Sequence, residues 1–162
     1  MNPLNSPLEV GIRILVILSE VFPDNLDLSQ LVYYDHALLH SADLSGPASL
    51  HPEIPARPGE LGIKRGLIQD GIQVLERAGL VELQAGSTGI TYRATERSPG
   101  FVGLLESPYV ANLRERAQWV ANEIHPLEPR ELRLAMARVF EKWSEEFEVG
   151  VRRRLSDGSG ES

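Results

Sequence analysis

A single stretch, residues 59–96, limits what this 162-residue chain can fold into. Apolar side chains recur at helical spacing over residues 60–78, and Gly79 is well placed as the left-handed residue that ends a helix. Two short strand-like segments follow, residues 80–83 and 90–95, joined by a turn with two glycines. A long helix leading directly into a β-hairpin is the ending of a winged helix-turn-helix. We therefore predict a mainly α fold with a β-hairpin wing.

Four further helices are predicted, two of them with a Ser-Pro start and one with Asp27 as its cap. They cover residues 6–22, 27–41, 107–124 and 129–149. Between the second and third helices of the chain, residues 41–59 hold four prolines and form a loop longer than is usual in a compact domain. We expect an ordered loop that packs on the body or on a partner; a floppy insertion is the alternative.

These elements predict three parts of the chain. Residues 1–103 form a winged helix-turn-helix that includes the long loop, and residues 104–150 form a C-terminal helical hairpin. The tail, residues 151–162, begins close to three arginines, continues with Ser, Asp and Gly, and is expected to be disordered.

Composition narrows the function classes. The formal net charge is −7 and the chain contains no cysteine, which excludes disulfides and Cys-ligated zinc and fits a cytoplasmic protein. The most apolar run, residues 10–18, is about half the length of a membrane span. An acidic chain repels nucleic acid as a whole, so DNA binding would need a local basic patch.

The predicted third helix carries such a patch only in part. Its outward face holds Arg65, Gln69 and Arg77, together with the acids Asp70 and Glu76 that would face phosphates. The wing tip has no Lys or Arg, and Arg93 lies away from it. Arg65, Arg77 and Arg93 are the candidate nucleic-acid contacts. The pattern favours a protein partner over DNA.

The histidines and acids near the long loop are the groups most able to do acid-base chemistry, but they form no recognisable catalytic motif. We predict no catalytic residues, no metal site and no cofactor, and therefore no enzyme. His36 and His40 have the helical spacing of metal ligands, yet no third ligand is evident, which favours buried or interfacial histidines. Trp119 lies outside the apolar stripe of its helix, as either a half-covered residue or an interface anchor.

Residues 40–72 followed by the hairpin resemble a known family, the middle components of ABC three-component systems. The residues that carry the resemblance lie mostly in the loop and at the start of the third helix. They are His40, Ser41, Asp43, Gly46, Pro47, Ser49, Leu50, His51, Pro52, Arg57, Gly59, Glu60 and Arg65. Similar proteins occur in Lamassu-type anti-phage defence.

The resemblance implies a winged-helix adaptor that docks on an SMC-like, ABC-type ATPase and links it to an effector such as a nuclease. The chain would then contact DNA only through the complex, and no membrane would be involved. The two predicted C-terminal helices could also form a homodimer. The alternative is a winged-helix transcription regulator. The predicted partner-binding residues are His40, Asp43, His51, Arg57, Glu60, Lys64, Arg65 and Gln69, with Trp119 on the C-terminal helices.

Overall fold

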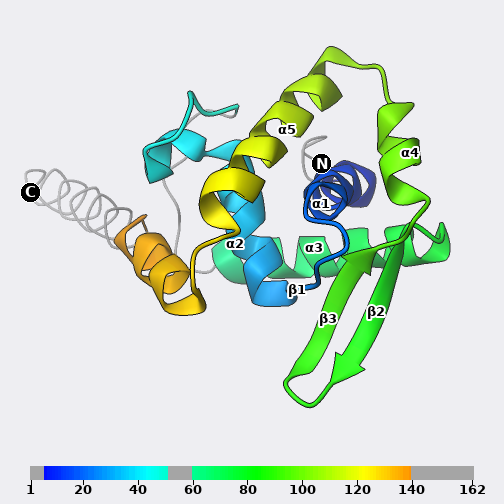
Figure 1. Cartoon of the computed structure of the whole chain (residues 1–162), viewed down its shortest axis with the longest axis horizontal. Helices are drawn as coiled ribbons and strands as arrows, with labels where there is room; N and C mark the ends of the chain where they lie inside the picture. Colours follow the sequence, from blue (N-terminus) through cyan, green and yellow to red (C-terminus); the bar gives the residue numbers. More distant parts are fainter. Residues whose placement is uncertain (1–5, 51–59, 140–162) are drawn as a thin grey trace, which may run out of the picture.

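The computed structural model describes residues 6–50 and 60–139, and Figure 1 shows their arrangement. The first helix, α1, spans Pro7–Glu20 and begins where the Ser6 hydroxyl accepts a hydrogen bond from the backbone of Glu9. The second helix, α2, spans Leu28–Leu39. Asp27 and Gln30 form a capping box at its start. Both helix starts predicted from the sequence are confirmed.

The long loop begins with a short 3-10 helix, η2, over Ser41–Leu44. The chain then returns to the end of α2, where the backbone N–H of Leu50 donates to the carbonyl of Leu39 at 3.0 Å. The Ser41 hydroxyl donates to the carbonyl of Pro47 at 2.8 Å inside this turn. Residues 41–50 are therefore ordered by their own hydrogen bonds, while residues 51–59 lie outside the described residues.

The third helix, α3, spans Glu60–Arg77, and Gly79 follows it with a φ of +72°, as the sequence predicted. The hairpin consists of β2, Val81–Gly86, and β3, Gly89–Ala94. A two-residue strand that the sequence did not predict, β1 over Leu26–Asp27, pairs with β3. The sheet is antiparallel, in the order β1-β3-β2.

Three helical segments follow the hairpin. The short helix α4 spans Ser98–Gly103, where the sequence predicted only a boundary. The next helix, α5, spans Pro108–Trp119 and continues as one π-helical turn, η3, over Val120–Ile124. Residues 129–139 are also helical, and the part of the predicted last helix beyond residue 139 lies outside the described residues.

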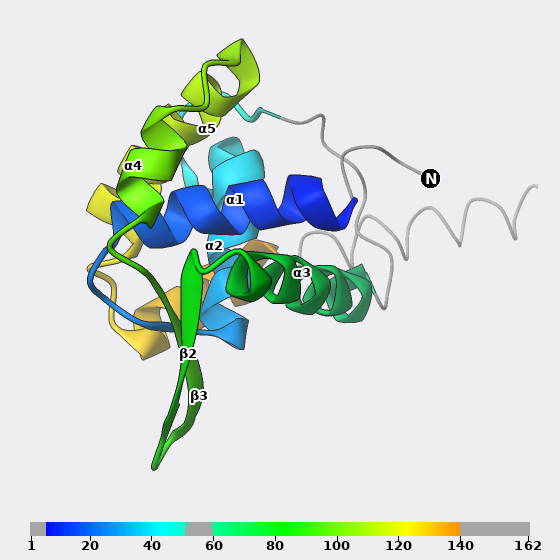
Figure 2. The ribbon, with the colours of Figure 1, turned by 90° about the vertical axis from the view of Figure 1, so that its right-hand side faces the viewer.

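The core is built around α1, which is buried along almost its whole length. Figure 2 shows α1 lying across the molecule between α3 and the pair α4 and α5. At the α1–α3 crossing the two backbones approach closely, because Gly11 and Gly71 face each other there. A Cβ on Gly71 would lie 3.0 Å from the nitrogen of Gly11. Glycine at this position is what permits the close approach.

The buried stripe of α3 is narrower than its apolar sequence pattern. Ile68, Ile72 and Leu75 are buried, whereas Ile63 is 66% exposed and Val74 is 37% exposed. The buried residues flank Gly71, where α3 crosses α1 closely.

One hydrophobic cluster contains residues from both sides of the boundary predicted at residue 103. It joins the core of α1 and α2 to Leu113 and Ala117 of α5 and to Leu132 and Met136 further on. The division into separate units stays a prediction. Among the described residues, no helix combines the length and apolar character that crossing a bilayer requires.

Candidate functional site

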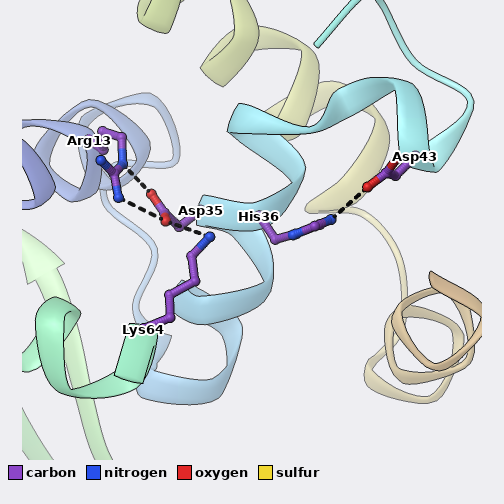
Figure 3. A network of polar contacts seen from close by, with 5 residues as sticks. All are labelled: Arg13, Asp35, His36, Asp43 and Lys64. Carbon is purple, nitrogen blue, oxygen red and sulfur yellow. Dashed lines mark hydrogen bonds and ion pairs between the residues drawn. The ribbon is translucent and has the colours of Figure 1, made fainter. Parts of the chain in front are cut away.

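A buried set of charged side chains joins the three central helices. Arg13 of α1 and Lys64 of α3 both reach Asp35 of α2, as Figure 3 shows. The Arg13 guanidinium donates to the two carboxylate oxygens at 2.8 and 3.3 Å, and the Lys64 ammonium lies 2.9 Å from Oδ2. Asp35 is thus the shared acceptor of two cations from neighbouring helices. We call Arg13, Asp35 and Lys64 the charge triad.

The triad is almost dry. Arg13 is 2% exposed and Asp35 is fully buried, while the Lys64 side chain keeps 20% of its surface exposed. Burial alone would raise the pKa of the Asp35 carboxyl, but Lys64 and Arg13 outweigh it and hold that pKa well below its ordinary value. A carboxylate held by two cations is a weak base, and removing one partner of such a buried pair is costly. This geometry favours a structural role.

His36, the next residue of α2, points the opposite way and meets the start of the long loop (Figure 3). Its Nε2 lies 3.2 Å from the Asp43 carboxylate of η2, and its ring packs against that of His40 at 4.9 Å between centroids. Burial, assisted by the nearby charge of Lys64, lowers the pKa of His36 to about 3. The ring is therefore neutral at pH 7, and its Nε2–H can donate to the carboxylate.

The histidine pair does not extend into a metal site within the part of the chain that the structure describes. No group of three or more His, Asp or Glu side chains is placed there to hold a metal ion. His36 is engaged by Asp43, and His40 stacks on His36. The arrangement holds η2 against the end of α2.

The loop after η2 is fixed to α5. The Arg116 side chain donates two hydrogen bonds to the carbonyl of Ala48, at 3.2 and 2.9 Å. Gly46 lies directly on the ring of Trp119, so that a Cβ there would be 2.3 Å from Cζ2. Trp119 is half-buried and packs against the core. Trp119 is therefore half-covered, by the loop rather than by a helix, and its role as an interface anchor stays a prediction.

A second polar tie was not predicted from the sequence. His125, just after η3, lies between Tyr34 of α2 and Asp24 of the turn after α1. Its Nδ1 is 2.9 Å from the Tyr34 hydroxyl and its Nε2 is 2.8 Å from the Asp24 carboxylate. Burial raises the pKa of Tyr34 to about 12, so the phenol remains a donor. Only the His125-Pro126 break was evident from the sequence.

The remaining candidate residues lie apart from the triad. Arg65, Gln69 and Arg77 are exposed on α3, and Arg65 donates to the Ser29 hydroxyl at 3.3 Å. Arg93 is paired with Glu82 across the hairpin at 3.1 Å. Glu60 begins α3, and His51 and Arg57 lie outside the described residues.

The fold is mainly helical with a small antiparallel sheet. The buried clusters of polar side chains connect its helices to one another. Residues 3–146 match the family described as ABC-three component (ABC-3C) system Middle Component 2, and the chain belongs to that family. The family resemblance inferred from the loop is thereby confirmed. No curated protein and no solved structure is similar enough to match the chain.

Proposed function

We propose that this chain is a non-catalytic adaptor in the cytoplasm of a bacterium, where it links an SMC-like, ABC-type ATPase to an effector such as a nuclease in anti-phage defence of the Lamassu kind. The observation that carries the proposal is the family match over residues 3–146, since a middle component belongs to an assembly of several proteins.

The internal use of the polar groups supports an adaptor over an enzyme. Asp35 is held by two cations, and His36 is paired with Asp43 in a buried position. A general acid or base needs a group within reach of a substrate and a pKa near the working pH. These groups instead stabilise the contacts of α2 with its neighbours.

We also assign α1, α2, α3 and the hairpin to a winged helix-turn-helix. Support comes from the element order α1–β1–α2–α3–β2–β3 and from the pairing of β1 with the hairpin. The hairpin projects from the body as a wing would (Figure 1). In this arrangement α3 is the helix that a partner would contact first.

The exposed side of α3 is the part of the predicted interface that the chain leaves available. Arg65 and Gln69 lie one turn apart and are exposed there. His40, Asp43, Lys64 and Trp119 have internal partners, and we propose that they act indirectly, by holding the loop and α3 in place for the partner. Glu60, His51 and Arg57 complete the proposed surface.

Co-purification with the ATPase of the same system tests the proposal. The full chain should co-elute with the ATPase. The double variant Arg65→Glu with Gln69→Glu should weaken the complex while lowering the free energy of unfolding by no more than about 1 kcal/mol, the contribution of the Arg65–Ser29 hydrogen bond. Arg114→Glu, on the exposed side of α5, is the matched control and should bind normally. If the chain binds neither the ATPase nor the effector, the adaptor proposal is wrong.

A winged-helix transcription regulator is the second candidate, favoured by the projecting hairpin. It requires Arg65, Arg77 and Arg93 to contact DNA, and it predicts binding that weakens steeply as salt is raised. Two observations weigh against the regulator: Arg93 is already paired with Glu82, and the exposed face of α3 has no net charge. A gel-shift titration at low salt decides: absence of any shift eliminates the regulator.

A further inference from the structure

The outer strand of the sheet, β2, has an open edge. In the order β1-β3-β2, only one side of β2 is paired. The backbone N–H of Thr95 donates to the carbonyl of Leu80 at 3.0 Å, which makes Leu80 and Thr95 a hydrogen-bonded pair of this ladder. Bonded and non-bonded pairs alternate in an antiparallel ladder. The N–H and C=O groups of Leu83 and Ala85 therefore point away from β3, towards the open edge.

This edge lacks the features that usually prevent strand addition. Edge strands are commonly shortened, bulged, or interrupted by Pro or Lys. The strand β2 has six residues, contains none of these residue types, and pairs with β3 in an unbroken register from Val81 to Gly86. Its single charged residue, Glu82, is paired with Arg93.

One face of the hairpin is apolar from base to tip. The pairing register places Leu83, Tyr92, Ala85 and Ile90 on the same face as the buried Val81 at the base. Leu83 is 46% exposed and Ile90 is 50% exposed. These two side chains lie on the part of the hairpin that projects beyond the helices.

The outer half of the hairpin also lacks a third strand. The strand β1 pairs with β3 only at Leu26 and Asp27, so the ribbon beyond Thr91 has two strands. Figures 1 and 2 both show this ribbon extending away from the helices. An isolated two-stranded ribbon is marginally stable in water, whereas a third strand stabilises it.

We infer that an extended basic segment of another component of the same system adds to β2 as an outer strand, with apolar side chains beside Leu83 and Ala85. Only a strand satisfies a row of open N–H and C=O groups while matching side chains that alternate between two faces. The inference rests on the proposed function for the origin of this segment.

Charge decides between a partner and a second copy. Residues 1–103 hold 7 basic and 12 acidic side chains, a net charge of −5, and the whole chain carries −7. Two copies therefore repel each other as they approach, whereas a basic segment is attracted. On the polar face of β2, Glu82 already pairs with Arg93, so the attraction comes from the net charge of this part of the chain.

The test uses the full chain with the purified ATPase and, separately, with the purified effector of its system. Ala85→Pro removes an outward N–H that the β2–β3 ladder does not use, and Leu83→Lys places a charge on the apolar face. Each variant should lower the affinity for one of the two components about tenfold or more. Leu104→Lys, an equal change at a side chain that is 78% exposed, should bind within about twofold of the parent.

Amide hydrogen exchange gives the direct readout. The amides of Leu83 and Ala85 should exchange quickly in the free chain and slowly in the complex. If the complex forms but both variants bind normally and these amides stay unprotected, the inference fails and the adaptor stands. If neither component binds, both fail together. If the chain alone self-associates and Ala85→Pro abolishes that association, the occupant is a second copy and the inference is wrong.

Discussion

The charge triad supports a prediction whose size can be worked out from burial. Replacing Asp35 by Asn removes the only anion of the triad and leaves Arg13, with a side chain 3% exposed, facing Lys64. The two cations then repel each other, and the guanidinium loses its closest counter-charge while it stays desolvated. The amide of Asn retains the shape of the side chain, so the change is electrostatic.

Removing one partner from a buried ion pair costs about 3–5 kcal/mol in the free energy of unfolding. We expect Asp35→Asn to lie in this range, because the Arg13 side chain is only 3% exposed. Lys64→Met should cost less, about 1–2 kcal/mol, since Arg13 still pairs with Asp35 and only one charged hydrogen bond is lost. Asp70→Asn on the exposed side of α3 should change the free energy of unfolding by no more than about 0.5 kcal/mol.

Urea unfolding followed by tryptophan fluorescence and circular dichroism measures all three variants against the parent chain. The order of the losses is the decisive result: Asp35→Asn largest, Lys64→Met smaller, Asp70→Asn near zero. If Asp35→Asn costs no more than Lys64→Met, the carboxylate does not hold the two cations together and the reasoning fails. A triple variant with Arg13→Met, Asp35→Leu and Lys64→Met should recover much of the loss, because it buries no charge.

Three further predictions follow from packing and protonation. Gly71→Ala should lower the free energy of unfolding by about 1–3 kcal/mol, because its Cβ would lie 3.0 Å from a backbone nitrogen of α1. The control Gly66→Ala, on the same helix, places its Cβ in open space and should raise the free energy of unfolding by about 0.5–1 kcal/mol. Gly46→Ala should displace the loop from Trp119 and shift the tryptophan emission, and an unchanged spectrum would refute that contact. The unfolded chain binds a proton at His36 between pH 6.5 and about 3 while the folded chain does not, so stability should fall on acidification through this window by up to about 1.4 kcal/mol per pH unit. In His36→Gln that slope should be smaller; equal slopes in parent and variant would contradict the low pKa.

Local signals in the sequence predicted the elements well. Ser6 and Asp27 cap α1 and α2 as expected, and Gly79 takes the left-handed conformation that ends α3. Capping and turn residues act on neighbours only a few positions away, so their effect can be predicted from the sequence alone. The hairpin followed from the same kind of local pattern.

The missed elements show where local patterns conflict. Asp27 was interpreted as a helix cap, which it is, and its second role in β1 depends on pairing with Thr91 far along the chain. Around residue 103 the sequence predicted only a domain boundary, whereas Pro99 is compatible with the first turn of a helix and lies in α4. Long-range pairing and the tolerance of helix starts for Pro are not visible in periodicity.

The sequence singled out only one member of the charge triad, Lys64, and missed Arg13 and Asp35. Lys64 was predicted as a partner-binding residue, whereas its partner inside the chain, the buried Asp35, was not predicted. The same holds for Asp43, whose partner His36 is seven residues away, and for Trp119, which packs on Gly46. A sequence shows which side chains are charged or large, whereas their partners depend on how helices cross.

The ties described above are unevenly distributed over the molecule, and this bears on how a partner could act on it. The loop is held to α5 through Arg116, and α2 is joined to the segment after η3 through Tyr34 and His125. The hairpin beyond Thr91 has no comparable tie among the described residues. A partner strand bound to β2 would therefore stabilise the least supported element and leave the buried core unchanged. The helix α3 leads directly into β2 and carries Lys64 into the triad, so it is the one element that adjoins the hairpin and also reaches Asp35. The triad variants should then weaken partner binding only to the extent that they loosen α3. Lys64→Met tests this link between α3 and partner binding apart from global unfolding, because it leaves the Arg13–Asp35 pair intact.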